Sequence, residues 1–375
     1  MLSYCHRSID DEIHEKADAP IIKSKNYQYE ERNMKYTRYI VAVFFLTGNF
    51  ICSYAQTFTV TKYRIGGDGG TDYITAEPGT GRIFVSRSSH VMVLNGNDGS
   101  ILGDIPGTPG THGIALVPKY NHGFTTNRGD SSVTMFDLKT LAFIKKIKIP
   151  AGGLDGIMYD TYSDHVILTN HSHPGTATAI DPNAGVVVGQ AELDDTSPEG
   201  AASDGKGKIF VNLEGRDAIQ VIDENTMTSV AVWPLAPSKG PTGIAYDGTT
   251  NRIFTGCSGT SAVLDASSGK IVATIHNGNG VDALGWDPVE KLIYIPAGRD
   301  SSVTIVRQDS QDSYSVVATV TTLSGAKTIS VDPVTHKAYL FQPVYGPPPA
   351  DAPPGRNGWR RRGPVLDAYL IVISH

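Results

Sequence analysis

Three histidines and two carboxylates between residues 112 and 199 carry the donor atoms that metal sites use. They are His112, Asp155, His171, His173 and Glu199. Imidazole nitrogens and carboxylate oxygens together are typical ligands of first-row transition metals. The segment 170–174 is equally consistent with an ordinary solvated turn, because loops are polar wherever they face water. Whether the five side chains meet depends on the elements that carry them.

Those elements form a repeat. An apolar strand core precedes a polar turn and a second strand that opens with a basic residue, as in 242–247 followed by 252–256. The pattern occurs seven times, with anchor residues Ile74, Ile114, Ile157, Ala201, Ile244, Leu284 and Ile329. Spacings of 40 to 45 residues with several short strands per unit are typical of β-propeller blades. The sequence therefore predicts an all-β, seven-bladed β-propeller with four-stranded blades.

The seventh unit lacks a fourth strand, because the chain ends soon after the apolar run 365–373. A spare strand, 57–65, precedes the first unit. Pairing the two would close the ring and remove an open sheet edge, which would otherwise template aggregation. We therefore expect the N-terminal strand to complete the last blade.

The second strand of each unit carries a recurring tetrapeptide. The seven versions are IFVS, FTTN, ILTN, FVNL, FTGC, YIPA and YLFQ. Together with Asp-x-x-Thr/Ser-Gly turns such as 265–269, they resemble the YVTN repeat of YncE-like seven-bladed β-propeller proteins. The resemblance covers residues 57–375, and no unit spells the tetrapeptide literally. It implies the propeller fold but little about function, because such repeats are scaffolds for many activities.

The segment 34–55 has the features of a secretory signal peptide. A basic flank precedes the apolar run 39–51, and small residues Ser53 and Ala55 close it. We interpret Met34 as the true start and residues 1–33 as a non-native upstream extension or a disordered tail; the alternative is a cytosolic tail on an uncleaved anchor. Cleavage would leave 56–375 as a single propeller domain, periplasmic or secreted, with no membrane span and one thiol, Cys257, which we expect to be packed.

Seven positions should surround one end of the central channel, which we call the channel mouth. They stand two residues before each anchor: Asp72, His112, Asp155, Glu199, Thr242, Asp282 and Lys327. The loops between second and third strands emerge on the same face and add Arg87, Arg128, Asp130, His171, His173, Glu214, Arg216, Arg299 and Asp300. Polar groups of both signs converging on a cavity predict a ligand site. The candidate ligand-binding residues are Asp72, His112, Asp155, His171, His173, Glu199, Asp282, Lys327, Arg128 and Arg299.

A Pro- and Arg-rich insertion, 342–364, interrupts the seventh blade. Its prolines argue against regular strand or helix. We expect a loop on the mouth face that carries Trp359 and four arginines. This loop could receive an anion or a protein partner, or it could be an insertion without a role.

Two classes of function fit these observations. The first is an exported binding scaffold that presents the channel mouth to a small ligand or a protein partner. The second is a channel-mouth enzyme, such as a metal-dependent lactonase or an oxidoreductase. The tryptophan-rich motif of quinoprotein propellers is absent, and the seven mouth positions lack the Asn of calcium-holding lactonases. A net charge of −6 argues against general nucleic-acid binding. We therefore favour a monomeric binding scaffold and assign no cofactor or metal.

Overall fold

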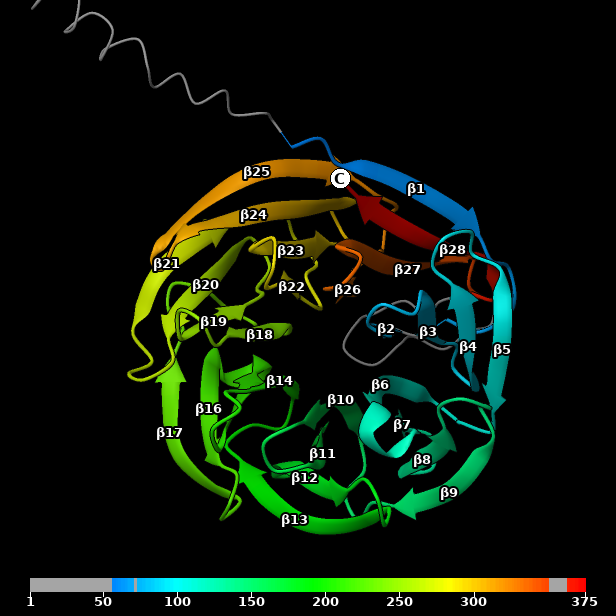
Figure 1. Ribbon diagram of the computed structural model, residues 1–375, viewed down its shortest axis with the longest axis horizontal. Coiled ribbons are helices and arrows are strands. Elements are labelled where there is room, and N and C mark those ends of the chain that lie inside the picture. Colours follow the sequence, from blue (N-terminus) through cyan, green and yellow to red (C-terminus); the bar gives the residue numbers. More distant parts are fainter. Residues whose placement is uncertain (1–55, 71–72, 351–362) are drawn as a thin grey trace, which may run out of the picture. The chain divides into compact units, whose positions relative to one another are not determined.

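The computed structural model describes residues 56–70, 73–350 and 363–375. These residues form seven four-stranded antiparallel sheets around a central axis (Figure 1). The predicted class, blade number and strands per blade are therefore confirmed. The predicted signal peptide, the segment 1–33, Asp72 and residues 351–362 of the insertion lie outside the described residues.

Each blade runs outward from the axis. The innermost strands are β2 (Ile74–Ala76), β6 (Thr111–Val117), β10 (Leu154–Asp160), β14 (Pro198–Ser203), β18 (Ile244–Asp247), β22 (Gly285–Asp287) and β26 (Ile329–Asp332). The second strands are β3 (Arg82–Ser86), β7 (His122–Asn127), β11 (His165–Asn170), β15 (Lys208–Leu213), β19 (Arg252–Thr255), β23 (Leu292–Ala297) and β27 (Lys337–Tyr345).

The outer half of each blade meets solvent. The third strands are β4 (His90–Asn95), β8 (Ser132–Asp137), β12 (Gly175–Asp181), β16 (Ala218–Asp223), β20 (Thr260–Asp265), β24 (Ser302–Ser310) and β28 (Val365–Ser374). The outermost strands are β5 (Ile101–Pro106), β9 (Phe143–Lys148), β13 (Val186–Leu193), β17 (Thr228–Pro234), β21 (Ile271–His276), β25 (Ser313–Thr321) and β1 (Thr59–Arg64). Two 3-10 turns, η1 (Pro118–Tyr120) and η2 (Glu214–Arg216), complete the described elements, and neither is long enough to span a membrane.

The core lies between neighbouring blades. Second strands such as β11 and β23 are buried almost throughout, whereas outermost strands such as β9 are mostly exposed. Aromatic side chains join adjacent sheets: the ring centroids of Phe254 in blade 5 and Trp286 in blade 6 are 4.8 Å apart. Side chains alternate across a strand, so a strand covered by sheets on both sides must be apolar on both faces. The stacking of blades thus explains the continuous apolar runs of the second strands.

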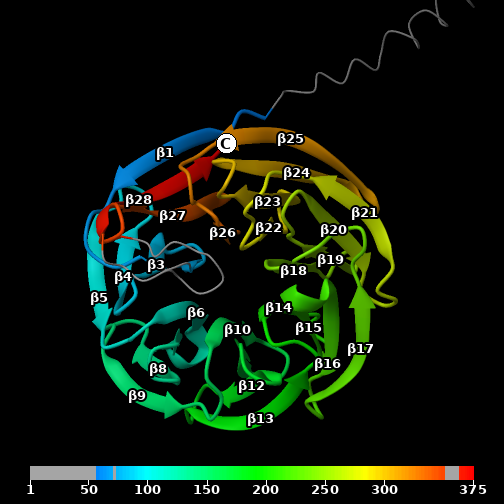
Figure 2. The same cartoon turned by 180° about the vertical axis from the view of Figure 1, so that it is seen from behind.

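The ring closes as predicted. In the seventh blade the strand order is β1-β28-β27-β26, and β1 pairs antiparallel with β28 from Thr59↔Ser374 to Arg64↔Tyr369. The two strands lie side by side in both views (Figure 1, Figure 2). Chain segments about 300 residues apart in sequence therefore share one sheet.

The insertion begins later than predicted. Gln342–Tyr345 continues β27 and pairs with β28, although the prolines argued against a strand there. The strand pair tolerates Pro343 because the backbone carbonyl and N–H of its partner, Ala368, form hydrogen bonds with other groups. The Ala368 carbonyl accepts from Ile65, and its N–H donates to the Asp367 carboxylate. A proline without an N–H therefore costs no hydrogen bond at this pair.

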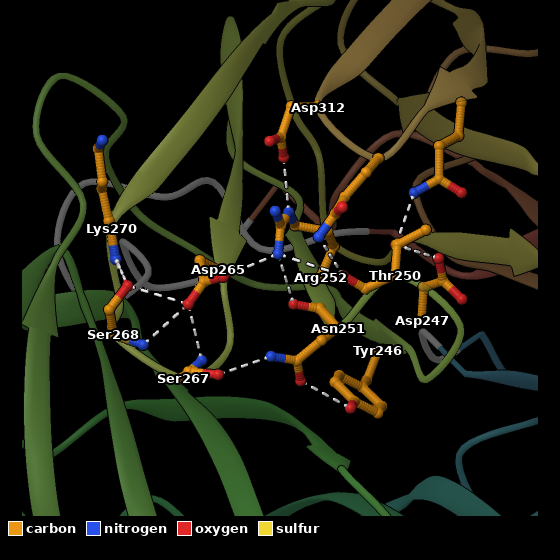
Figure 3. A network of polar contacts seen from close by, with 12 residues as sticks. Tyr246, Asp247, Thr250, Asn251, Arg252, Asp265, Ser267, Ser268, Lys270 and Asp312 are labelled. Carbon is orange, nitrogen blue, oxygen red and sulfur yellow. Dashed lines mark hydrogen bonds and ion pairs between the residues drawn. The ribbon is translucent and has the colours of Figure 1, made fainter.

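Aspartates form the turns that follow four of the innermost strands: Asp160, Asp247, Asp287 and Asp332. Each accepts a hydrogen bond from a backbone N–H two or three residues later. Asp265 does the same between β20 and β21 and also binds the buried Arg252 at 2.8 Å (Figure 3). Arg252 reaches Asp312 of blade 6 at 2.8 Å, so this turn also joins two blades.

Candidate functional site

Small residues let the innermost strands meet around the axis. In six blades the residue before the anchor is Gly, Ala or Thr. A Cβ at Gly200 would lie 2.8 Å from the Thr242 carbonyl oxygen, and one at Gly156 would lie 3.5 Å from the Glu199 carbonyl oxygen. These contacts bring the innermost strands of blades 3, 4 and 5 close together. The mouth residues Asp155, Glu199 and Thr242 of these blades are therefore neighbours.

Side chains of the second strands form hydrogen bonds with the backbone of the mouth residues. The Thr126 hydroxyl of blade 2 donates to the Asp155 carbonyl of blade 3 at 2.7 Å. The Ser86 hydroxyl of blade 1 likewise donates to the His112 carbonyl. In blades 1 and 2, a polar residue of the repeated tetrapeptide thus connects the blade to the next one at the channel mouth.

Three of the predicted residues converge at this mouth. His171 Nε2 lies 3.4 Å from Asp155 Oδ2 and 3.4 Å from Glu199 Oε1. One ligand atom from each residue lies within 4.8 Å of the other two. The His171 Nε2 atom is shielded from solvent and forms no hydrogen bond with any described residue. We call Asp155, His171 and Glu199 the mouth triad.

The surroundings of the mouth triad are charged. Arg128 binds Asp155 through a short ion pair, and Asp155 is 6% exposed. Lys327 and Asp282 form a second pair at 2.7 Å. Partial burial, with the charge of Asp282 adding to it, raises the pKa of Glu214. Four carboxylates therefore face two cations in this part of the channel.

Burial and crowding perturb the titration of the triad. Burial raises the pKa of Glu199 to about 8; the negative charges of Asp155 and Asp282 act in the same direction, and His171 opposes them. Burial disfavours the imidazolium of His171, but the two carboxylates beside it outweigh that effect and raise its pKa. Perturbed carboxyl and imidazole groups in a cavity are typical of binding and catalytic sites.

A cavity of about 160 Å³ lies in the channel along the innermost strands. Residues of six blades line it, and they include Tyr73, Gly156, Thr242, Asp282 and Thr328. Polar groups therefore occur both at the mouth and within the channel.

Other predicted residues stay apart from the triad. His112 Nδ1 lies 3.0 Å from the Gly110 carbonyl, and His173 is exposed. Arg299 packs against Gly280, since a Cβ added at Gly280 would lie 2.7 Å from the Arg299 side chain. Arg87 is fully buried and donates to the carbonyls of Gly69 and Gly66, so the expectation that it faces the mouth is wrong.

Cys257 is packed, as expected. It is fully buried, and burial raises the pKa of its thiol to about 12. A thiol with so high a pKa is a poor nucleophile at neutral pH. Cys257 therefore has no chemical part in the site.

Sequence reasoning missed Tyr73. It stands directly before the anchor Ile74, where the other six blades have Gly, Ala or Thr, and it lines the cavity. A Cβ at Gly156 would lie 3.5 Å from the Tyr73 hydroxyl, so the side chain of blade 1 reaches blade 3. Burial raises the pKa of Tyr73 well above its usual range, and Asp155 and Glu199 add to this. The signal in the sequence was a large residue, Tyr73, at a repeat position where the other blades have a small one.

A second hollow, of about 610 Å³, lies at the base of the insertion. It is lined by Lys62, Leu323, Ser324, Gln342, Pro343, Val344, Tyr345 and Tyr369. Among the described residues its lining is mostly apolar, and Lys62 is the charged side chain. The convergence of charges that the sequence predicted is therefore found at the channel mouth rather than in this hollow.

Comparisons with known proteins support the fold. No protein-family model and no curated protein match the chain. A chain of hydrazine synthase from Kuenenia stuttgartiensis is similar, with 17% identity over 78% of this chain and 96% of its own, and a TM-score of 0.65. A chain of the mitotic checkpoint complex is 13% identical over 88% and 95%, with a TM-score of 0.65. The RRP9 WD40 repeats are 8% identical over 84% and 97%, with a TM-score of 0.69. Identities this low show the propeller fold alone, and the likeness to YVTN repeats stays a prediction.

Proposed function

We propose that this chain is an exported β-propeller binding protein that holds a small polar ligand or an ion at its channel mouth. The observation that carries the proposal is the mouth triad, in which three side chains from two blades aim donor atoms at one point beside a cavity. Buried polar atoms without hydrogen bonds are costly and are retained mainly where they have another use. His171 Nε2 is shielded from solvent and has only two long contacts, at 3.4 Å, with the carboxylates of Asp155 and Glu199.

The size of the cavity limits the ligand. Drug-sized ligands occupy pockets of roughly 300–1,000 Å³, whereas this cavity measures about 160 Å³. Carboxylates outnumber cations around it, so the preferred ligand is small and carries positive charge or hydrogen-bond donors. Asp282 lines the cavity and is the group through which we test this proposal.

Ligand binding is tested by thermal unfolding of the full chain against a library of small polar metabolites and cations. A ligand at about 100 times its dissociation constant stabilises a protein by about 2.7 kcal/mol. We expect at least one compound to raise the Tm of the wild type but not of Asp282→Asn, which keeps the size of the side chain. Equal shifts in both proteins would place binding elsewhere, and the absence of any shift would contradict the proposal.

Export rests on the segment 34–55. Expression of the full gene in a host with a secretory pathway should yield exported protein that begins at Gln56. Mass spectrometry of the purified protein gives its first residue. An uncleaved chain retained in the cell would contradict the proposed localisation and leave the ligand proposal untouched.

A hydrolase is the second candidate. The observation that favours it is the raised pKa of Glu199, because a carboxyl that titrates near neutral pH can act as a general acid or base. Turnover of a lactone panel with added divalent cations, lost in Glu199→Gln, would select this function over simple binding.

A protein partner at the mouth face is a variant of the binding proposal. One similar chain comes from a structure titled as a complex, the mitotic checkpoint complex, which supports a propeller of this shape taking part in an assembly. We propose that the chain itself is a monomer, and size-exclusion chromatography with light scattering measures this directly.

A further inference from the structure

The mouth triad has the spacing of a metal site. Ligands held by Zn²⁺ at about 2.0–2.2 Å in a tetrahedron lie about 3.3–3.6 Å from one another. His171 Nε2 lies 3.4 Å from Asp155 Oδ2 and 3.4 Å from Glu199 Oε1. Two of the three separations therefore already match a tetrahedral edge, and all three donor atoms lie within 4.8 Å.

A hydrogen-bonded cluster explains these contacts less well. Hydrogen bonds between nitrogen and oxygen are usually 2.7–3.2 Å long. The distances from His171 Nε2 to the two carboxylate oxygens, 3.4 Å each, exceed this range. The atom is also shielded from solvent and has no hydrogen bond among the described residues. A nitrogen that water does not reach and that lies 3.4 Å from two carboxylate oxygens can bind a cation together with them.

The local charge also favours a cation. The carboxyl groups of Asp155, Glu199, Asp282 and Glu214 outnumber the cationic side chains Arg128 and Lys327 around His171. Buried charges are unfavourable unless they are paired. Two carboxylates and a neutral imidazole of this cluster would supply the paired charge for one divalent cation.

We propose that Asp155, His171 and Glu199 bind one divalent first-row transition cation, of which Zn²⁺ is the probe. This inference rests on the proposed function and names the ligand class of its site. The imidazole excludes a typical calcium site, since Ca²⁺ takes six to eight oxygen ligands. Three protein ligands leave a fourth tetrahedral position for water or a further ligand, as in catalytic rather than structural zinc sites.

The test uses the full chain, untagged, stripped with a chelator and dialysed. Calorimetric titration with Zn²⁺ should give one ion per chain. Loss of outer-shell partners of a metal typically weakens binding about 10–100-fold, so loss of a ligand in His171→Ala should weaken it by roughly 100-fold or more. His173→Ala, which removes an exposed imidazole two residues away, should bind like the wild type. Cobalt substitution should give intense visible bands of a tetrahedral site in the wild type but not in His171→Ala.

Two results would overturn the inference: no stoichiometric Zn²⁺ binding by the wild type, or equal affinities of His171→Ala and His173→Ala. If His171→Ala does not fold, as judged by circular dichroism, the near-isosteric Glu199→Gln decides, with a loss of at least about 10-fold expected. A third result would separate the two proposals. If the metal-free protein binds no Zn²⁺ but an organic ligand stabilises it in a way that depends on Asp282, the metal site is rejected and the proposed function is kept.

Discussion

At the residue scale, burial perturbs a carboxyl at the other end of the blades. The Ser163 hydroxyl contacts both Asp160 and Glu224, yet it can donate to only one of them. A protonated Glu224 relieves this competition, because it can donate a hydrogen bond of its own to Ser163 or to Asp160. Burial raises the pKa of Glu224 to about 7, and Asp160 and Asp204 act in the same direction.

This arrangement predicts a loss of stability with rising pH. The pKa of Glu224 in the folded chain, about 7, exceeds its ordinary value of 4.5, so the folded state binds more protons between these values. Stability contributed by the protonated group is therefore present below about pH 4.5 and is lost as pH rises through 7. Glu224→Gln should reduce the difference in unfolding free energy between pH 5 and pH 8 by on the order of 1–2 kcal/mol.

Urea unfolding at the two pH values measures the difference. The exposed Glu192→Gln is the matched control and should keep the pH dependence of the wild type. An unchanged slope in Glu224→Gln would show that this carboxyl ionises freely in the folded protein.

At the element scale, the approach of the innermost strands depends on residues without bulk. A Cβ at Gly243 would lie 2.2 Å from the carbonyl carbon of Ala283 in the next blade. This clash is with backbone, so no side-chain rotation can relieve it. At Gly248 the nearest atom would be 3.5 Å away, on the Tyr246 ring, which is ordinary contact. The two glycines therefore form a natural pair of test and control.

Gly243→Ala should destabilise the fold by about 2–4 kcal/mol, since overpacking forces strand displacement, whereas Gly248→Ala should change stability by less than about 1 kcal/mol. Thermal or urea unfolding of the two variants measures this. Similar stabilities would mean that blades 5 and 6 can separate near the axis at little cost.

Arg252 gives a second prediction at this scale. It is buried and bonds Asp265, Asp312 and the Thr250 and Asn251 carbonyls, so it joins blades 5 and 6 (Figure 3). Arg252→Met removes all of these donors and should cost about 2–3 kcal/mol in unfolding free energy. Arg307→Met, which breaks the more exposed pair with Asp309, should cost less than about 1 kcal/mol. A reversed order of the two costs would contradict the role of this network.

At the scale of the whole molecule, one pair of strands closes the ring. Thr59 and Ser374 are register partners in β1 and β28, at the two ends of the described chain. Joining them by Thr59→Cys/Ser374→Cys should form a disulfide under oxidising conditions. A cross-link that closes so long a loop should raise stability by about 2–5 kcal/mol.

Unfolding with and without reductant measures the gain of this cross-link. Thr59→Cys/Leu366→Cys is the off-register control and should not cross-link. Efficient oxidation of the control but not of the register pair would mean that β1 pairs differently or leaves the sheet in solution.

The sequence alone determined the architecture of this protein. Strand periodicity, turn aspartates and the seven anchors are local in sequence, so they predicted the blade count, and the missing strand at the C-terminus predicted closure with β1. Counting two residues back from each anchor also located Asp155, Glu199 and Asp282. These predictions succeed because every blade repeats one backbone geometry.

Only the tertiary structure decided which side chains meet at the channel mouth. His171 joins Asp155 and Glu199, while His173 turns to solvent, His112 turns to the Gly110 carbonyl, and Arg87 is buried beneath the segment that leads into blade 1. The direction of a loop side chain depends on the turn that carries it and on neighbours from other blades. Neither is encoded in the repeat, because neighbouring blades come together in space only when the ring closes.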